Sequence, residues 1–340
     1  MERQPPAPYR GGMARGSFPI LFITATRIGD AVLSSGLIRK LLEEIPTARF
    51  TIVVGPDAAP LFAEVPNLDQ LIVFDKHKGG GHWVGLWNQV RDKKWGLVVD
   101  LRGSAINRFL TTKRRAVFRK NSGPPVHKVI EAARVLKVDD DPPAPFLFTS
   151  AATEARADEL TAGQGPILAI APASNWVGKT WPIERFAQAA IQLLGKGGPL
   201  EGGRLMILGG ANDFQIVAPL RHVVLKNRFI DLVGKVDLLT AYACLKRARL
   251  FIGNDSGLMH VAAAAGTPTL GLFGPSDERR YGPWGDHARA VRGVRDLDEI
   301  RRVDPGLNQE ICHMMDLGVR TVTLAAKEVL EATAPVEDDA

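Results

Sequence analysis

Short apolar runs alternate along the chain with longer stretches whose apolar residues recur at helical spacing. The short runs are nearly continuous in apolar side chains, which is typical of parallel strands buried on both faces of a sheet. In the first half they predict strands at 20–24, 50–54, 70–74, 96–100 and 116–118. In the second half they predict strands at 167–171, 204–208, 229–233, 250–253 and 269–273. Helices are predicted at 31–45, 183–194, 237–246, 256–265 and 321–333. Such alternation predicts parallel sheets covered by helices.

The segment 138–145 interrupts this alternation with three consecutive aspartates followed by prolines. It cannot form a helix interior, so it indicates a connection between domains. A length of 340 residues also favours two domains, since one domain takes about 150 residues. We therefore expect a flexible leader over 1–17, domains over 18–150 and 151–320, and a C-terminal helix with an acidic tail over 321–340. The predicted fold class is α/β, with two tandem Rossmann-like doubly wound domains facing a cleft.

Composition and charge narrow the class of protein. Hydrophobic residues make up 45% and charged residues 24% of the chain, the proportions of a folded globular protein. The net charge of +6 favours anionic partners but does not by itself indicate nucleic acid. Basic residues concentrate in 102–120, which contains no acidic residue. Two cysteines, Cys244 and Cys312, cannot provide a disulfide framework. With no predicted signal peptide or membrane-spanning run, we expect a cytoplasmic protein.

Ligands of open parallel sheets bind at the carboxyl ends of the strands, so the loops after strands are the places to search for chemistry. Arg27 to Asp30 leads from the first strand into the first long helix. Asp30 has two interpretations. It caps the helix by accepting backbone N–H groups, or it is a carboxylate available as a general base.

The loop after the first strand of the second domain contains Ser174, Asn175 and Lys179. A lysine beside a helix N-terminus suits a phosphate or diphosphate, although a solvated loop lysine is the plainer interpretation. After the next strand come Gly209, Gly210 and Asp213. The two glycines permit close backbone approach to a ligand, but most such pairs are simple turns.

A fourth loop follows the strand predicted at 250–253 and contains Asp255, Ser256, Gly257 and His260. It places backbone donors and a helix N-terminus at the same sheet edge. Capping of the helix by Asp255 or Ser256 is the structural alternative. The chain lacks the G-x-S-x-G elbow typical of hydrolases, and it lacks the G-x-G-x-x-G motif typical of proteins that bind a nicotinamide cofactor.

No metal site is predicted. The aspartates at 139–141 and at 296 and 298 do not follow apolar strands, which makes them ordinary loop charges. His77 and His82 flank a glycine run and lack further ligands. We therefore expect neither a metal ion nor another cofactor.

The motifs and the order in which they follow one another along the chain resemble those of glycosyltransferase family 9, the ADP-heptose:lipopolysaccharide heptosyltransferases. The matching elements are R-x-G-D at 27–30, G-K-x-W-P at 178–182, G-G-x-x-D at 209–213, D-S-G-x-x-H at 255–260, and G-T-P with L-F-G-P-S at 266–276. Residues 312–315 are similar to a Cys-Met segment near the family's C-terminus. The long basic leader and the reduced cysteine set depart from the family pattern.

The resemblance implies a GT-B glycosyltransferase fold whose C-terminal helix returns to the first domain. It implies inverting, metal-independent transfer of heptose from ADP-heptose to the lipopolysaccharide core, with Asp30 as the catalytic base. The first domain would then be the acceptor side and the second the nucleotide-sugar side. The implied donor-binding residues are Ser174, Asn175, Lys179, Gly209, Gly210, Asp213, Asp255, Ser256, Gly257 and His260.

The basic residues of the first domain suggest the partners on that side. Lipopolysaccharide cores are polyanionic, so Arg27, Lys113, Arg114 and Arg115 are the candidate acceptor-binding residues, with peripheral contact to the inner membrane. No nucleic-acid partner is expected. Two alternatives stay open: a nucleotide-sugar epimerase with the same two domains, and a protein that only binds a nucleotide or a phosphorylated glycan.

Overall fold

The computed structural model describes residues 16–75, 81–120, 122–308 and 310–334. Its contacts divide the chain into two compact units. The first unit comprises Met1–Pro124 and Val129–Pro143, and the second comprises Pro125–Lys128 and Ala144–Ala340. The last division falls inside the acidic, proline-rich segment 138–145. The expected leader (1–17), apart from its last two residues, and the acidic end of the tail lie outside the described residues.

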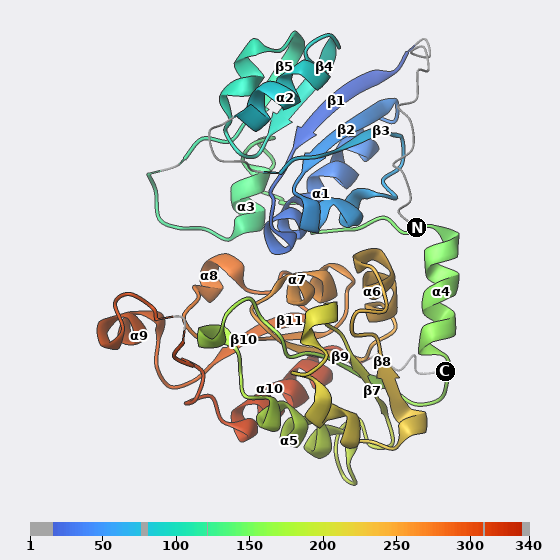
Figure 1. Cartoon of the computed structure of the whole chain (residues 1–340), viewed down its shortest axis with the longest axis vertical. Coiled ribbons are helices and arrows are strands. Elements are labelled where there is room, and N and C mark those ends of the chain that lie inside the picture. Colours follow the sequence, from blue (N-terminus) through green and yellow to red (C-terminus); the bar gives the residue numbers. More distant parts are fainter. Residues whose placement is uncertain (1–15, 76–80, 121, 309, 335–340) are drawn as a thin grey trace. The chain divides into compact units, whose positions relative to one another are not determined.

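The first unit is a five-stranded parallel sheet with helices (Figure 1). Its strands are β1 (Phe18–Ile23), β2 (Ala48–Val54), β3 (Leu68–Val73), β4 (Trp95–Asp100) and β5 (Thr112–Val117). Its helices are α1 (Ile28–Glu44), α2 (Gly81–Val90) and α3 (Lys128–Ala133), whose first residue belongs to the second unit. Leu86 and Val90 of α2 pack with Leu21 and Ile23 of β1, so an apolar helix face covers an apolar sheet face.

The strand order of this sheet is β3-β2-β1-β4-β5. The chain builds outward from β1 in one direction through β2 and β3, and then returns to place β4 on the other side of β1. The topological switch point therefore lies between the carboxyl ends of β1 and β4. In open α/β sheets, ligands bind at this point.

The second unit is a six-stranded parallel sheet. Its strands are β6 (Ile167–Ala171), β7 (Arg204–Ile207), β8 (Phe229–Asp231), β9 (Leu250–Asn254), β10 (Thr269–Phe273) and β11 (Ala288–Arg292). Its helices are α4 (Ala151–Thr161), α5 (Ile183–Leu194), α6 (Leu238–Leu245), α7 (Gly257–Ala264), α8 (Glu278–Tyr281), α9 (Leu297–Val303) and α10 (Val319–Ala332). The order β11-β10-β9-β6-β7-β8 places the switch point between β6 and β9.

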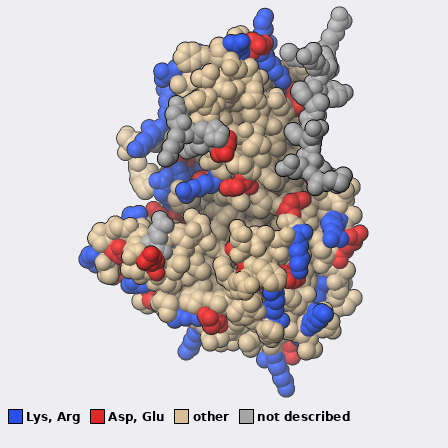
Figure 2. Space-filling model, in the orientation of Figure 1, with Lys and Arg blue, Asp and Glu red and all other residues tan. Residues whose placement is uncertain are grey.

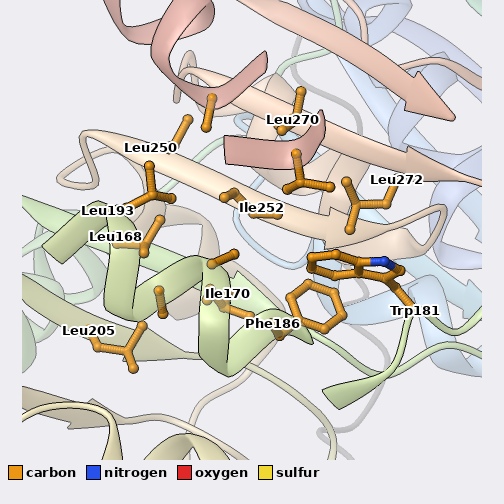
Figure 3. Close-up of a cluster of buried hydrophobic side chains, with 14 of the residues drawn as sticks. Leu168, Ile170, Trp181, Phe186, Leu193, Leu205, Leu250, Ile252, Leu270 and Leu272 are labelled. Atoms are coloured by element: carbon orange, nitrogen blue, oxygen red, sulfur yellow. The ribbon is translucent and has the colours of Figure 1, made fainter. Parts of the chain in front are cut away.

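The core of the second unit lies between its sheet and helices α5 and α10. Leu168, Ile252 and Leu272 from three strands pack with Trp181 and Phe186, whose rings meet edge to face at 4.8 Å (Figure 3). Each fully buried side chain of this size stabilises the fold by about 2 kcal/mol relative to an exposed one.

Helix α10 corrects one expectation. Its apolar residues, among them Val322, Ala326 and Leu330, are part of the second unit's core. The sequence analysis expects this helix to return to the first domain, and for its packing face that expectation is wrong. The physical reason is that α5 covers only part of the apolar sheet face of the second unit. The amphipathic helix α10 packs beside α5 and covers the part formed by β9, β10 and β11.

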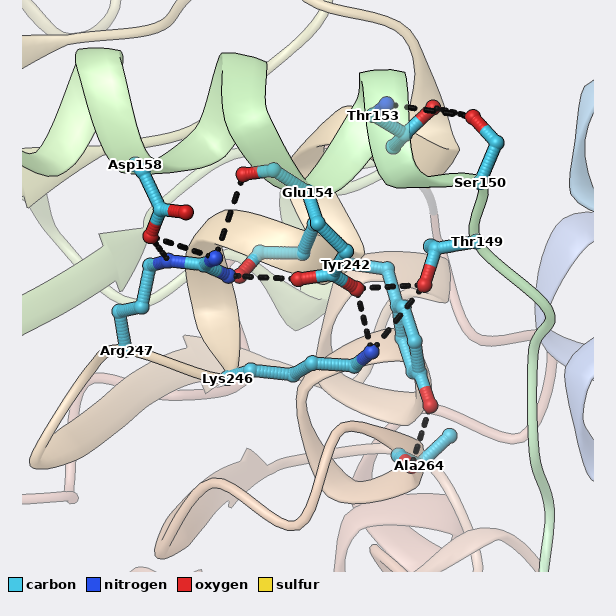
Figure 4. Close-up of polar contacts among 10 residues, drawn as sticks. Thr149, Ser150, Thr153, Glu154, Asp158, Tyr242, Lys246, Arg247 and Ala264 are labelled. Atoms are coloured by element: carbon cyan, nitrogen blue, oxygen red, sulfur yellow. Dashed lines mark hydrogen bonds and ion pairs between the residues drawn. The ribbon is translucent and has the colours of Figure 1, made fainter.

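Helix α4 is held on α6 by polar contacts (Figure 4). The carboxylate of Glu154 accepts from Lys246 Nζ at 2.6 Å and from Arg247 Nη1 at 2.9 Å. These charges, with a hydrogen bond from Thr149, hold the pKa of Glu154 at about 2 against the opposing effect of burial. The network ties the first helix after the interdomain connection to the body of the second unit.

None of the helices in the described part of the chain combines the length and apolar composition needed to cross a bilayer.

Candidate functional site

The switch point of the second unit brings two predicted loops together. Lys179 lies in the loop after β6, and Asp255 follows β9 directly. Lys179 Nζ is 3.3 Å from Asp255 Oδ2, and the two side chains are only 15% and 12% exposed. The pair joins residues 76 positions apart, at the sheet edge where ligands of this fold class bind.

Asn254, the last residue of β9, fixes these two loops. Its side chain is fully buried. Its Nδ2 donates to the carbonyl of Pro172 at 2.6 Å, and its Oδ1 accepts from the backbone N–H of Trp181 at 3.0 Å. The amide thus bridges both ends of the loop that carries Lys179. Sequence analysis does not single out Asn254, because its importance depends on the pairing of β6 with β9.

The same loop is also held from the C-terminal segment. The backbone N–H of His313 donates to the carbonyl of Gly178 at 3.0 Å, and Trp181 Nε1 donates to the carbonyl of Leu317 at 2.8 Å. A Cβ at position 178 would come within 1.9 Å of the ring of Trp176, so the loop closes this tightly only with glycine. Lys179 is therefore mounted on a rigid turn.

His260 and Ser256 carry unsatisfied polar atoms beside this pair. His260 is 4% exposed, and burial lowers its pKa to about 4, with the positive charges of His127 and Lys179 acting in the same direction and Asp255 acting against it. His260 Nδ1 and Ser256 Oγ are buried without a hydrogen-bond partner in the described chain. Buried polar atoms are nearly always satisfied, so these two indicate a place for a polar ligand.

Helix capping does not explain this motif. Ser256 occupies the N-cap position of α7, but its side chain makes no capping hydrogen bond. Asp255 pairs with Lys179 instead. The structural alternative raised for these residues from the sequence is therefore wrong.

His127 is a residue that sequence analysis missed. It belongs to the short segment Pro125–Lys128 of the second unit. Its Nε2 lies 3.0 Å from the carbonyl oxygen of Gly282, and its ring lies 4.8 Å from that of Trp284. Burial lowers the pKa of His127, although the Gly282 contact opposes this. No motif marks it, since only folding brings it near His260.

The remaining predicted residues of the second unit form turns. Ser174 Oγ donates to the carbonyl of Trp176 at 2.9 Å and contacts Thr180 Oγ1 at 2.7 Å, while Asn175 is exposed. Asp213 Oδ2 accepts from the N–H of Gly210 at 2.7 Å, which closes a turn after β7, the strand next to β6. Lys179 and Asp255 are thus in direct contact and both act electrostatically on His260, whereas Gly209, Gly210 and Asp213 form a turn of their own.

Asp30 lies at the switch point of the first unit. It is the third residue of α1 and is half-buried, whereas the N-cap position belongs to the exposed Arg27. Asp30 is therefore not the N-cap residue of α1 and lies within its first turn. Thr24 Oγ1 and Ser34 Oγ, 2.8 Å apart, hold the start of this helix against the end of β1.

The basic segment 102–120 presents exposed side chains, one of which also supports the fold. Lys113, Arg114 and Arg115 are all exposed on β5. Arg115 additionally donates to the carbonyls of Asn107 at 2.9 Å and Leu110 at 2.6 Å, so its guanidinium supports the preceding loop. On the second unit the visible charges are of both signs and interspersed (Figure 2).

Within the described residues, no group of three or more His, Cys, Asp or Glu side chains is arranged to hold a metal ion.

Comparison with known proteins connects this geometry to a family. The model for glycosyltransferase family 9 (heptosyltransferase) matches residues 86–306. The chain is 25% identical to lipopolysaccharide heptosyltransferase 2 of Salmonella typhimurium over 324 residues, which covers 84% of this chain and 91% of that protein.

Two solved structures are similar throughout. A family 9 glycosyltransferase from Veillonella parvula superposes with a TM-score of 0.74 at 22% identity and covers 94% of this chain and 99% of that one. The ADP-heptose lipopolysaccharide heptosyltransferase II of E. coli gives 0.72 at 20% identity, with 92% and 99% covered. The likeness confirms the predicted fold class, two parallel-sheet α/β domains of the GT-B type.

Proposed function

This chain belongs to glycosyltransferase family 9, the heptosyltransferases, and from that premise we propose that it transfers a heptose from ADP-heptose to the lipopolysaccharide core with inversion and without a metal ion. Two relatives support the choice of donor and acceptor: the E. coli enzyme is an ADP-heptose lipopolysaccharide heptosyltransferase, and the Salmonella typhimurium protein is a lipopolysaccharide heptosyltransferase. The family assignment favours transfer over the epimerase and binding-protein alternatives.

The proposed binding of the donor rests on one observation, the grouping of Lys179, Asp255 and His260 at the switch point of the second unit. Lys179 supplies positive charge for the diphosphate, which gains negative charge as it leaves. The unsatisfied atoms Ser256 Oγ and His260 Nδ1 hydrogen-bond to the donor. The turn of Gly209, Gly210 and Asp213 faces the ribose.

Neutral His260 fits this role. Because its pKa is about 4, the ring is uncharged at neutral pH, and one nitrogen donates while the other accepts. A neutral ring in a buried position discriminates among hydroxyl and phosphate oxygens by geometry rather than by charge. Preorganised groups of this kind need no metal ion to stabilise the leaving group.

Asp30 acts as the general base on the acceptor side. It takes the proton of the acceptor hydroxyl as that oxygen attacks the anomeric carbon opposite the departing diphosphate. A single inverting displacement needs one such carboxylate, whereas a retaining mechanism with a covalent intermediate needs a second as nucleophile. At the first turn of α1 the helix dipole favours the charged form of this carboxylate.

Replacement of Asp30 by Asn tests the mechanism. We expect ADP binding and folding to persist while turnover falls by about 10²–10⁴, the usual contribution of general-base catalysis. Asp57→Asn is the matched control, because Asp57 is an exposed carboxylate in the first turn after the neighbouring strand β2. Near wild-type turnover by Asp30→Asn would remove Asp30 as the base.

Two further measurements test donor and metal. ADP release from ADP-heptose should require acceptor, and the product linkage should show inverted anomeric configuration by NMR. Activity should survive EDTA. Loss of activity with EDTA that Mn²⁺ or Mg²⁺ restores would contradict metal independence, and isomerised donor without acceptor would favour an epimerase.

A further inference from the structure

Arg102 lies at the ligand-binding edge of the first unit. It is the second residue after β4, and the N–H of its neighbour Leu101 donates to the carbonyl of Ile23 at the end of β1. Arg102 therefore stands at the switch point between β1 and β4, the same edge from which the loop to Asp30 departs. Neither the family motifs nor the predicted acceptor residues include it.

The backbone around Arg102 is rigid because Asp100 organises it. The fully buried carboxylate of Asp100 accepts from the backbone N–H groups of Arg102 at 3.0 Å and Ser104 at 2.8 Å, and from the side chains of Ser104 and Asn107. Gly103 adopts a φ of 62°. The turn that presents Arg102 is thus fixed before any ligand binds.

The guanidinium of Arg102 rests on two aromatic rings. Its Cζ lies 5.1 Å from the centroid of Phe74 and 5.3 Å from that of Trp83. Phe74 follows β3 and Trp83 belongs to α2, and the two rings lie 4.6 Å apart. The three residues, here called the Arg102 stack, hold the planar group in one orientation, which lowers the entropy lost when it binds a ligand.

This guanidinium has no carboxylate partner among the described residues. The carboxylate of Asp100 is occupied by neutral donors of Arg102, Ser104 and Asn107. Arg102 contributes only its backbone N–H to this carboxylate. Burial lowers the pKa of Arg102, and the charge of Asp100 opposes that shift without cancelling it. A half-buried guanidinium that forms no direct ion pair loses hydration without a full compensating contact, so an incoming anion binds it with little competition from the protein itself.

Arg91 provides the contrast within the same unit. Its Cζ lies 4.6 Å from the ring of Trp87, so it too is stacked. However, it pairs with Asp92 at 3.6 Å and is 45% exposed. Stacking alone therefore does not distinguish Arg102. The distinguishing features of Arg102 are that its guanidinium forms no ion pair with a carboxylate of the described residues and that it lies at the switch point.

We propose that the Arg102 stack is an oxyanion-binding site that holds a carboxylate or phosphate group of the acceptor sugar next to the hydroxyl that is glycosylated. The bidentate guanidinium recognises two oxygens of the anion, and Trp83 contacts the apolar face of the sugar ring. The inference rests on the proposed function, since it specifies the acceptor as an anionic sugar.

Binding of small probes tests the site without turnover. The full-length protein is titrated with glucose 6-phosphate, glucuronate and uncharged glucose, with binding followed by calorimetry. We expect one or both anionic sugars to bind, and glucose to bind at least about tenfold more weakly, since a charge-assisted bidentate contact supplies the difference. Tighter binding of glucose 6-phosphate would identify phosphate as the recognised group, and tighter binding of glucuronate would identify carboxylate.

Variants then assign the binding to Arg102. Arg102→Gln should abolish the preference for the anionic probes, Arg102→Lys should retain a weaker and more salt-dependent preference, and Arg91→Gln should match the wild type. ADP binding should be unchanged in all three variants, which shows that the second unit is intact. Equal binding of the three sugars by the wild type, or an undiminished preference in Arg102→Gln, would overturn the proposal.

A kinetic measurement separates this site from the proposed function. With lipopolysaccharide core oligosaccharide as acceptor, Arg102→Gln should raise the acceptor KM at least about tenfold while the KM for ADP-heptose stays the same. If the wild type binds the anionic probes through Arg102 but transfers no heptose, the proposed function fails and the site stands. If transfer proceeds with the same acceptor KM in Arg102→Gln, the site fails and the proposed function stands.

Discussion

Replacement of Lys179 by Met is the perturbation that the geometry makes most informative. Lys179 Nζ lies 3.3 Å from Asp255 Oδ2, and both side chains are largely buried. At an effective dielectric constant of 20, the Coulomb attraction at this separation is about 5 kcal/mol, much of which the desolvation of the two charges offsets. Removal of one partner leaves the other buried charge unpaired, which costs about 3 kcal/mol and lowers the melting temperature by roughly 6 to 10 °C.

The same substitution tests the donor role, but only in two backgrounds. Lys179→Met removes the cation from a diphosphate and also leaves Asp255 unpaired, so its effect alone is ambiguous. In an Asp255→Asn background the second effect is absent. If Lys179 contacts the diphosphate, Lys179→Met should weaken ADP binding at least about tenfold and lower kcat by about 10²–10³ in both backgrounds.

The assay combines calorimetric ADP titration, steady-state kinetics and thermal unfolding of the four proteins of this cycle. The double variant should recover most of the lost melting temperature without recovering ADP binding. Lys235→Met is the control, because Lys235 forms a pair at 3.0 Å with Asp231 but is 54% exposed, and such surface pairs contribute about 1 kcal/mol or less. If ADP binds the double variant and Asp255→Asn equally, Lys179 serves only to neutralise Asp255, and the reasoning is refuted.

Three further predictions concern pH and charge. The folded-state pKa of His260 is about 4 and its ordinary value is 6.5, so the unfolded chain binds more protons between these pH values. The free energy of unfolding should therefore fall by about 2–3 kcal/mol as pH drops from 6.5 to 4. Urea unfolding at several pH values should show a flatter profile for His260→Gln, and an unchanged profile would contradict this. The pKa of Glu154 is about 2 against an ordinary value of 4.5, so its ionised carboxylate stabilises the fold fully above pH 4.5 and loses this effect as pH falls towards 2. In the same unfolding assay, Glu154→Gln should lower the free energy of unfolding by about 1 kcal/mol at pH 7 and leave it unchanged near pH 2. Replacement of both Lys113 and Arg114 by Ser should raise the acceptor KM at low salt but not at high salt. Each exposed cation near an anionic surface contributes about 1 kcal/mol to binding, and salt screens this attraction beyond about 10 Å. Acceptor kinetics that do not change at low salt would argue against docking on this strand.

Much of the architecture was predictable because buried parallel strands leave a direct signal. Strands β6 and β10 and helix α5 begin and end at the predicted residues, since each is a run of apolar or amphipathic residues bounded by turn formers. Strand β11 was missed because it reads Ala-Arg-Ala-Val-Arg. Its arginines pair with Glu328 of α10 and with Glu278 of α8, the helix directly before the strand, and a pattern of apolar residues does not reveal such pairs.

The candidate site was only partly predictable for a related reason. Motif spacing pointed to Lys179, Asp255 and His260, but not to their mutual contacts or to the low pKa of His260, which follows from burial that folding creates. Asn254 and His127 had no sequence signal, since their partners Pro172 and Gly282 are backbone carbonyls far along the chain. The expectation for α10 came from the family resemblance and was wrong for its packing face, and the sequence of the helix could not correct it, because amphipathicity predicts a buried face but not which sheet covers it.

The contacts between the Lys179 loop and the C-terminal segment set an order of events during synthesis. Trp181 and Leu317, joined by a hydrogen bond, are separated by 136 positions. At ribosomal rates of about 5–20 residues per second, the loop leaves the ribosome on the order of 10 s before its anchor. The strands around it can pair meanwhile, but the Lys179 loop reaches its final shape only when the segment that contains His313 and Leu317 docks on it. A nascent chain truncated before this segment should therefore contain the Lys179 motif and still lack its geometry, so that donor binding is gained only after the segment has emerged.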